Sequence, residues 1–335
     1  MKKVTIKDIA AIVNTSPKTV SKALNNQPGV SQALRQKIKK TAEELNYVPN
    51  IFGRGLSGKP LRTIGIIIPE NSNPFYSFVI KGLEQQAAEA DYTIILCNSN
   101  DNLQRERKLI QVLMEKHVDG MIISPAKPDK NHNIERLQRL RIPYTLINRA
   151  IPDQDHPCVK ARNVDGAYLA GRFLIQKGHA NIVYLTRQRS VTAVEERLQG
   201  FQQAFQEQRI LFDEHRAVYR RCRDISVESA YVAMLSILKE RQDFSAVFAF
   251  NDIIAFGAMK AIREYRLDIP HDIAVMGFDN IMFSDISLVP LTTVNQNLPE
   301  IGMSAVDVLL QQIDGTFSGQ YRPMPAPYIV ERQSV

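Results

Sequence analysis

Apolar residues in the first sixty positions recur every three or four places, the spacing that puts side chains on one face of a helix. This spacing predicts a first helix over 5–13, a second beginning at Pro17 and a third from about 31 to 45. Their apolar faces are formed by Ile6, Ile9, Ala10 and Val13 in the first, Val20, Ala23 and Leu24 in the second, and Leu34, Ile38, Ala42 and Leu45 in the third. Three such faces can close one small core.

Polar residues mark where the first two of these helices begin and end. Thr5 and Asp8 have the spacing of a capping box. Ser16 can accept a hydrogen bond from a free backbone N–H, and Pro17 suits the first helical position, where no amide donor is needed. Asn14 tolerates the left-handed backbone conformation of a tight turn between helices. The pattern therefore predicts a helix-turn-helix.

The polar face of the second helix carries Lys18, Ser21 and Lys22, and it is free to contact DNA. Two short helices joined by a tight turn also occur in bundles that bind no nucleic acid, so this pattern alone does not decide between the two. Residues 1–60 hold eleven Lys and Arg against three Asp and Glu, a net charge of +8, whereas the whole chain carries +7 and residues 61–335 therefore carry −1. A basic excess confined to one small module indicates phosphate binding.

From Arg62 onward, short apolar runs alternate with helical spacing. The run 64–68, ended by Pro69, is typical of a buried parallel strand. Further strands are expected over 92–97, 120–124, 144–147, 182–185, 246–250, 273–277 and 328–331, and helices over 74–90, 103–116, 133–140, 164–177, 195–208, 226–239 and 252–265. Alternation of this kind predicts an α/β core with two lobes, each built on a doubly wound parallel sheet. The segment 291–312 is expected to return to the lobes.

The order of short motifs near the N-terminus carries a resemblance. T-I-K-D-I-A, S-P-K-T-V-S-K-A-L-N, V-S and E-L-N-Y-V-P-N, followed by a hinge with Leu56, resemble without a gap the headpiece of the LacI/GalR family, the lactose- and galactose-repressor-like regulators. The later α/β pattern is similar to the periplasmic-binding-protein-like core of the same family. The resemblance implies a headpiece over 1–49, a hinge helix and linker over 50–60, and an effector-binding and dimerisation domain over 61–335. In that domain, lobe 1 is expected at about 61–161 and 294–323, and lobe 2 at about 162–293 and 324–335.

The resemblance places the DNA-contacting side chains in the headpiece and hinge, at Thr5, Ser16, Pro17, Lys18, Thr19, Ser21, Lys22, Asn25, Asn50 and Leu56. Pro17, Lys18 and Lys22 are expected to face the major groove, where a lysine can donate to guanine, and Thr19, Ser21 and Asn25 lie nearer the phosphates. Leu56 is expected to pry open a base step from the minor groove.

The hinge departs from a good helical sequence. Gly53 and Gly55 each disfavour a helix by about 1 kcal/mol relative to Ala. We therefore expect residues 50–57 to become helical only on operator DNA. Hydrogen-exchange protection of those residues in the absence of DNA would contradict this expectation.

In open α/β sheets, ligands lie beyond the carboxyl ends of the strands. The resemblance matches Arg197 to the family's effector-clamping arginine, and Asn251, Asp279 and Gln296 to its other polar contacts. Phe75 or Tyr76 would supply a stacking face. The full set of expected effector-binding residues is Asn73, Phe75, Tyr76, Asn148, Arg149, Arg189, Arg197, Asn251, Asp279 and Gln296. An alternative stays open in which Asn251 only caps a helix and Asp279 only shapes a turn.

Two features favour an anionic effector. Asn148 stands where sugar-binding relatives often place Asp. Arginines expected to surround the cleft are Arg149, Arg187, Arg189 and Arg197. Guanidinium groups recognise phosphate and carboxylate in a bidentate way. The hypothesis at this point is a sugar phosphate or sugar acid, with a neutral sugar as the other possibility.

Several classes of protein are disfavoured by what the sequence lacks. It has no apolar run typical of a signal peptide or membrane span, which points to the cytoplasm. Cys97, Cys158 and Cys222 are far apart, and the histidines show no metal-ligand spacing, so we expect no metal and no cofactor. No nucleophile elbow, P-loop or catalytic carboxylate pair is present, so we expect no enzyme.

The sequence is best interpreted as a ligand-responsive transcriptional regulator, most often a repressor in this family, acting on carbohydrate genes. It is expected to bind a palindromic operator as a homodimer, because two half-site readers related by a two-fold axis require a two-fold DNA sequence. A dimer is preferred to a tetramer because no heptad tail follows the last strand. The alternatives are a sugar-processing enzyme or sugar-binding protein on the same fold, and a regulator controlled by a phosphorylated partner protein.

Overall fold

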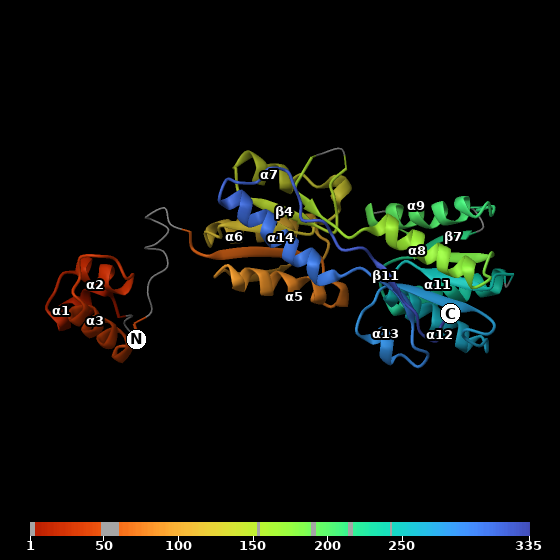
Figure 1. Ribbon diagram of the computed structural model, residues 1–335, viewed down its shortest axis with the longest axis horizontal. Coiled ribbons are helices and arrows are strands. Elements are labelled where there is room, and N and C mark those ends of the chain that lie inside the picture. The colour runs from red at the N-terminus through yellow and green to blue at the C-terminus, as the bar shows by residue number, and fades with distance from the viewer. Residues whose placement is uncertain (1–3, 48–59, 153–154, 189–191, 214–216, 242) are drawn as a thin grey trace. The chain divides into compact units, whose positions relative to one another are not determined.

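The computed structural model describes residues 4–47, 60–152, 155–188, 192–213, 217–241 and 243–335. It forms two compact units, Met1–Leu61 and Arg62–Val335, coloured from red through to blue in Figure 1. The first unit is helical and the second is α/β, as the hydrophobic pattern predicts.

In the first unit, α1 (Ile6–Val13), α2 (Pro17–Leu24) and α3 (Gln32–Glu44) pack around one apolar core. Ile9, Val20 and Ile38 are fully buried in it, one from each helix. The predicted apolar faces therefore meet, and each helix is stabilised by burying its stripe rather than by length, since helices this short are marginal alone.

The predicted helix ends are confirmed by hydrogen bonds. The Asp8 carboxylate accepts from the backbone N–H of Thr5 at 2.7 Å. Ser16 Oγ accepts from the N–H of Thr19 at 3.1 Å, with Pro17 at the first helical position. Asn14 closes α1 with φ 55°, the left-handed conformation expected for the turn.

The α/β unit contains two sheets. The first has the strand order β2-β1-β3-β4-β5, all parallel. Its strands are β1 (Thr63–Ile68), β2 (Thr93–Asn98), β3 (Gly120–Ile123), β4 (Tyr144–Ile147) and β5 (Cys158–Val159). Around it lie α5 (Pro74–Glu89), α6 (Leu103–Glu115), the 3₁₀ turn η1 (Pro128–Lys130), α7 (Asn133–Arg139) and α14 (Leu298–Ile313). We call this sheet with its helices lobe 1.

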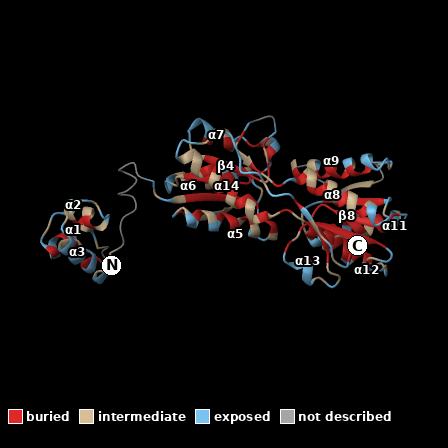
Figure 2. Cartoon of the chain, in the orientation of Figure 1, coloured by how far each residue is buried: buried red, intermediate tan, exposed pale blue. Residues whose placement is uncertain are grey.

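The second sheet has the order β11-β10-β9-β8-β6-β7 and is parallel except for β11. Its strands are β6 (Ile182–Arg187), β7 (Val218–Cys222), β8 (Ala246–Ala249), β9 (Ala274–Asp279), β10 (Thr292–Asn295) and β11 (Tyr328–Val330). Its helices are α8 (Asn163–Gln176), α9 (Thr192–Glu207), α11 (Val227–Glu240), α12 (Asp252–Glu264) and α13 (Phe283–Ile286). We call this sheet with its helices lobe 2. Figure 2 shows that the inner strands of both sheets are largely buried.

The chain crosses between the lobes after β5, after β10 and again before β11. The second crossing returns α14 to lobe 1, where it packs closely on α5. A Cβ placed on Gly302 would come within 2.1 Å of the Val79 carbonyl oxygen, and one placed on Gly82 within 1.9 Å of the Pro299 carbonyl oxygen. Glycine is therefore required where these two helices meet.

Three strands and two α-helices were absent from the sequence-based expectation, in which the segment that holds α14 (Leu298–Ile313) was expected only to return to the lobes. β7 has arginines in its middle and lies at a sheet edge, so it shows no continuous apolar run. β5 has only two residues. β10 begins with two buried threonines whose hydroxyl groups form hydrogen bonds, so it too lacks an apolar run. α13 has four residues, too few for a helical period.

Candidate functional site

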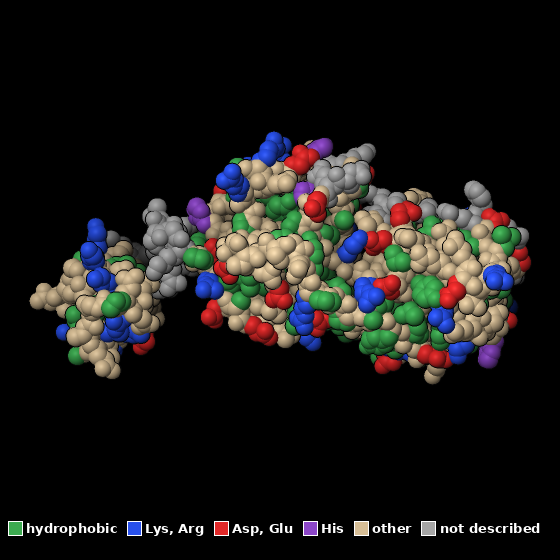
Figure 3. Space-filling view, turned by 45° about the horizontal axis from the view of Figure 1, so that its top comes forward, with side chains coloured by type: hydrophobic (Ala, Val, Ile, Leu, Met, Phe, Trp, Pro, Cys, Tyr) green, Lys and Arg blue, Asp and Glu red, His purple; other side chains and the backbone are tan. Residues whose placement is uncertain are grey.

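The face of α2 opposite the core is accessible. Val20 and Ala23 are buried, whereas Ser16, Pro17 and Lys18 are exposed. The remaining predicted DNA contacts in the described part of the headpiece are also accessible, with Thr5 and Asn25 exposed and Thr19, Ser21 and Lys22 half-buried. Figure 3 shows Lys and Arg side chains standing on the surface of this unit. Asn50 and Leu56 lie outside the described residues.

Two side chains of this unit are engaged with α2 itself. Arg35 donates to the carbonyl oxygens of Ala23 at 3.2 Å and Gln27 at 2.6 Å. The Arg35 guanidinium therefore closes the C-terminal end of α2. Asn25 Nδ2 donates to the Ser21 carbonyl oxygen at 2.8 Å, so its amide also supports the helix end.

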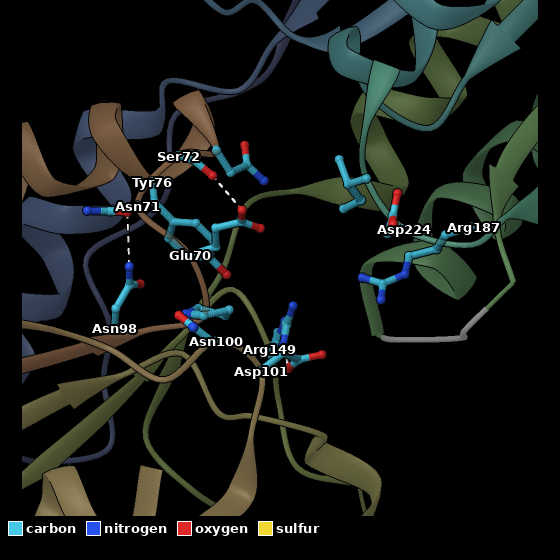
Figure 4. A pocket seen from close by; sticks show the side chains of 13 residues that line it. Glu70, Asn71, Ser72, Tyr76, Asn98, Asn100, Asp101, Arg149, Arg187 and Asp224 are labelled. Carbon is cyan, nitrogen blue, oxygen red and sulfur yellow. Dashed lines mark hydrogen bonds and ion pairs between the residues drawn. The ribbon is translucent and has the colours of Figure 1, made fainter. Parts of the chain in front are cut away.

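In the α/β unit, a cavity of about 480 Å³ lies at the carboxyl ends of strands from both lobes. We call it the strand-end pocket. It is lined by Pro69, Glu70, Asn71, Ser72, Asn73, Tyr76, Asn98, Asn100, Asp101, Arg149, Arg187, Asp224 and Ile225. Figure 4 shows Arg187 and Asp224 of lobe 2 across the cavity from the labelled residues of lobe 1. Its size suits a small organic ligand.

Three of the predicted effector-binding residues line the strand-end pocket: Asn73, Tyr76 and Arg149. Asn73 also caps α5, accepting from the N–H of Phe75 at 3.0 Å. The Tyr76 hydroxyl is 2.9 Å from Ser124 Oγ and 3.5 Å from Asn148 Nδ2. Asn148 and Phe75 do not line this pocket; Phe75 is buried, with its ring edge-to-face on Tyr76.

Arg197, Asp279 and Gln296 form a separate buried cluster that does not line the strand-end pocket. The Arg197 guanidinium lies 3.9 Å from the ring centroid of Phe278, and donates to Asp279 Oδ1 at 3.2 Å. It also donates to Asn163 Oδ1 at 3.0 Å, and Gln296 donates to the same carboxylate of Asp279. The structure therefore brings these predicted contacts together, but as partners of one another.

Asn251 is the remaining predicted effector-binding residue in the described part of the chain. Asn251 is buried and caps α12, with its Oδ1 accepting from the N–H of Ile254 at 3.0 Å. This geometry agrees with the alternative in which Asn251 is a helix cap. Arg189 lies outside the described residues.

Two carboxyl groups of lobe 2 are buried, Asp279 within the Arg197 cluster and Asp252 of α12. Burial raises the pKa of Asp279 to about 6, although Arg197 and Gln296 lower it. Burial and the neighbouring Asp279 raise the pKa of Asp252 to about 7. Asp252 accepts from Ile281 N–H and Ser284 Oγ, both at 2.8 Å, and from Thr293 Oγ1 at 2.5 Å. It therefore ties α12 to β10 and to the segment around α13.

Two family models match nearly the whole chain. The model described as "Periplasmic binding proteins and sugar binding domain of LacI family" matches residues 61–330. The model described as "Bacterial regulatory proteins, lacI family" matches residues 5–50, which contain α1, α2 and α3. The chain belongs to the LacI family. It is accordingly a DNA-binding transcriptional regulator controlled by a small effector, and not an enzyme.

Individual LacI-family relatives match over almost their full length. The chain is 32% identical to the HTH-type transcriptional repressor PurR of Vibrio atlanticus (strain LGP32), covering 99% of this chain and 98% of the relative. It is 32% identical to the ribose operon repressor of Escherichia coli (strain K12), covering 98% and 99%. The solved lac repressor dimer bound to operator and the anti-inducer ONPF is 25% identical, with a TM-score of 0.88 and 99% of each chain covered.

Sequence reasoning missed part of the pocket wall of this LacI-family protein. Asn98 ends β2 and Asn100 and Asp101 follow it, whereas Asp224 and Ile225 follow β7. The rule that ligands meet strand ends would have found the first group had it been applied to β2. The second group follows a strand that the pattern did not reveal, so no local signal pointed to it.

Glu196 of α9 contacts residues at the crossing between the lobes that follows β5. Its side chain is only 18% exposed, and it forms an ion pair with Lys160 and accepts from Asn163 Nδ2 at 2.9 Å. Asn163 in turn accepts a hydrogen bond from Arg197. Glu196 therefore supports the buried cluster through Asn163.

Across the described residues, no helix is both long enough and apolar enough to span a membrane. In the same residues, no three His, Cys, Asp or Glu side chains are grouped to hold a metal ion.

Proposed function

We propose that this LacI-family protein is a repressor of carbohydrate-metabolism genes that binds a palindromic operator as a homodimer, under the control of a sugar-like effector. The observation that carries the proposal is the accessible, capped helix α2 in the same chain as a polar cavity at the strand ends of two lobes. The DNA-binding helix and the small-molecule site then belong to one chain, so the affinity for DNA and the affinity for the ligand can be linked.

For the headpiece, the proposal assigns α2 to the major groove. Pro17, Lys18 and Lys22 would face base edges, and Thr19, Ser21 and Asn25 the phosphates. Support comes from the exposure of this helix and from the basic charge of residues 1–60. Residues 50–57, with Asn50 and Leu56, are proposed as the hinge that enters the minor groove.

For the effector, we place the ligand in the strand-end pocket. Its wall offers amides, hydroxyls and carboxylates, which pair well with the alternating donors and acceptors of a polyol. One relative, the ribose operon repressor of Escherichia coli, is named for a sugar operon. Arg197, Asn251, Asp279 and Gln296 are proposed as further contacts or as support for the lobe 2 wall.

Two of the arginines that favoured an anionic effector already form ion pairs within the protein. Arg149 is ion-paired with Asp101 at 2.6 Å, and Arg197 with Asp279 at 3.2 Å. A sugar phosphate or sugar acid would have to compete with those partners.

For the homodimer, we propose that a second copy covers the apolar patch on and beside α13. Met282, Phe283, Ile286 and Leu288 are 62%, 44%, 74% and 73% exposed. Leu288 also lines a groove between α12 and residues 287–289. Figure 3 shows hydrophobic side chains gathered on the surface of lobe 2. Apolar patches of this kind mark association surfaces. The related lac repressor structure is a dimer on operator DNA.

The proposal is tested by footprinting the purified full chain genome-wide on fragmented DNA from its source organism, at one fixed salt concentration, because phosphate contacts make affinity salt-dependent. Sharp peaks that share a palindrome beside carbohydrate genes are expected. The control variant K18A should lose the peaks while keeping its fold. Weak uniform binding by both proteins would argue against sequence-specific repression.

The effector half of the proposal is tested on the operator so found. Neutral sugars suggested by the neighbouring genes are added one at a time, and the change in operator affinity is measured. A sugar that shifts this affinity at least tenfold supports the proposal. If only a phosphorylated partner protein shifts it, control by such a partner replaces control by a sugar.

A further inference from the structure

Among the described residues that line the strand-end pocket, carboxylates outnumber guanidinium groups. Glu70, Asp101 and Asp224 face Arg149 and Arg187. Figure 4 shows Glu70 and Asp101 on the lobe 1 side and Asp224 beside Arg187 on the lobe 2 side. An anion entering the cavity therefore meets negative charge from both lobes.

Arg149 is compensated before any ligand arrives. Its Nη1 donates to Asp101 Oδ1 at 2.6 Å and to the Pro125 carbonyl oxygen at 3.2 Å, and the residue is only 8% exposed. A ligand anion could use this guanidinium only by displacing Asp101. The displaced carboxylate would then sit in a partly buried place without its cation, which is unfavourable.

The fold holds this ion pair in place from the loop after β3. Three consecutive residues of the loop contribute: the Pro125 carbonyl accepts from Arg149, the N–H of Ala126 donates to Glu106 at 2.6 Å, and the N–H of Lys127 donates to Asp101 at 3.3 Å. Glu106 is fully buried and anchors the loop through Ala126. The pair is thus set by backbone groups of the fold.

Asp101 also adopts a backbone conformation that few residues tolerate. Its φ is 51°, and that of Asn100 is 52°, in the left-handed region where Asp and Asn are the commonest residues besides glycine. An asparagine at position 101 can keep both this conformation and the acceptor oxygen. The charge can therefore be removed without changing the shape of the wall.

We infer that Asp101 is the specificity-determining residue of the pocket: by neutralising Arg149 it makes the pocket select uncharged, hydroxyl-rich ligands over anionic ligands of the same skeleton. The inference rests on the proposed role of the strand-end pocket as the effector site. It assigns the charge of the ligand and not its identity. It predicts a neutral ligand, where the arginines alone suggested an anionic one.

The test is isothermal titration calorimetry on the full chain at fixed ionic strength. The probes are two matched pairs, D-ribose with D-ribose 5-phosphate and D-glucose with D-glucose 6-phosphate, and inorganic phosphate. Wild type is expected to bind no phosphorylated probe more tightly than its neutral partner. D101N is expected to gain at least tenfold in affinity for a phosphorylated probe or for inorganic phosphate, because Arg149 becomes available.

Two further variants show whether the gain depends on Arg149. E70Q removes one negative charge from the same pocket without touching the ion pair, and it should gain less than threefold. D101N/R149M should lose the gain of D101N. Equal gains in E70Q and D101N, a gain retained in D101N/R149M, no gain in a folded D101N, or a wild-type preference for a phosphorylated probe would each overturn the inference.

These outcomes are independent of the outcome for the proposed function. Charge selectivity measured by calorimetry can hold although no sugar changes operator affinity, in which case repression by a sugar effector fails and the role of Asp101 stands. Conversely, an anionic sugar that both binds tightly and controls operator binding would support the regulator and overturn the inference.

Discussion

Individual buried charges in this protein are compensated by partners that are distant in sequence. Arg197 combines an aromatic face with three acceptors, and Asp101 is 48 residues from the Arg149 that it neutralises. Asp252 differs from these, because its buried carboxyl group accepts three hydrogen bonds from uncharged donors and has another carboxyl group, Asp279, as a charged neighbour. Such a group favours its protonated form.

Asp252 should therefore make stability depend on pH. Its pKa is raised to about 7 in the folded protein, while an unfolded Asp has a pKa of about 3.9. Between these values the folded state binds the extra proton, so this group's contribution to the free energy of unfolding falls as pH rises, by up to about 1.4 kcal/mol per pH unit. Urea unfolding at pH 5 to 8 is expected to show a wild-type decline that is weaker in D252N. A difference between the two proteins that stays constant over this range would contradict the assignment.

At the scale of elements, α2 is held at both ends by side chains from its surroundings. Ser16 closes its N-terminal end and Arg35, from α3, its C-terminal end. The helix has eight residues, so it needs these contacts and its buried stripe to remain ordered.

Substitution of Arg35 distinguishes a structural role in α2 from an electrostatic contact with DNA. R35M is expected to reduce hydrogen-exchange protection of α2 and to destabilise the headpiece by about 1–3 kcal/mol, because charge-assisted hydrogen bonds to the backbone are lost. The slope of operator affinity against salt should stay as in wild type. K37M, at an exposed position of the same helix, removes the same charge and should leave α2 protection intact. A slope reduced by about one unit in R35M would instead indicate a phosphate contact.

The contact between α5 and α14 gives a prediction in which two effects have opposite signs. Helix propensity alone predicts that G302A stabilises the protein by about 1 kcal/mol. The 2.1 Å approach of a Cβ to the Val79 carbonyl oxygen instead predicts overpacking, which costs about 1–3 kcal/mol. We expect a lower melting temperature and weaker protection of α5 amides. An increase in melting temperature would show that the two helices can separate without loss.

At the scale of the whole molecule, the proposed function requires two copies of the chain, each with two lobes and a headpiece. The headpiece carries one half-site reader, so a palindromic operator requires a second copy. The segment around α13, which carries exposed apolar residues, is connected through Asp252 to β10 and α12. Asp279 of the buried cluster raises the pKa of Asp252, so the proposed dimer surface and this cluster are linked through one carboxyl group.

The proposed dimer surface is tested by placing charge in it. The double variant I286D/L288D is expected to shift the sedimentation coefficient at micromolar concentration from dimer to monomer, and to weaken operator binding by at least a hundredfold because half of the contacts are lost. L211D is the matched control, since Leu211 is 90% exposed in lobe 2 outside this patch. An unchanged dimer in I286D/L288D would place the interface elsewhere.

The sequence by itself determined the local features of this protein. The helices of the headpiece, their caps at Thr5 and Ser16, and most strands and helices of the α/β unit follow from periodicity and capping. These features depend on residues within a few positions of one another, so a local pattern is sufficient. The short motifs of the headpiece likewise identified the family before any fold was considered.

Only the tertiary structure decided which strand ends share a pocket and which charges are already paired. The sheet order places β2 and β4 on opposite sides of the β1–β3 pair, and the loop after β3 joins Asp101 to Arg149. The tertiary structure also places Asn73, Tyr76 and Arg149 in the pocket wall, but Arg197, Asp279 and Gln296 in a separate buried cluster. Ion pairing and burial depend on contacts between distant segments, and no periodicity in the sequence records those contacts.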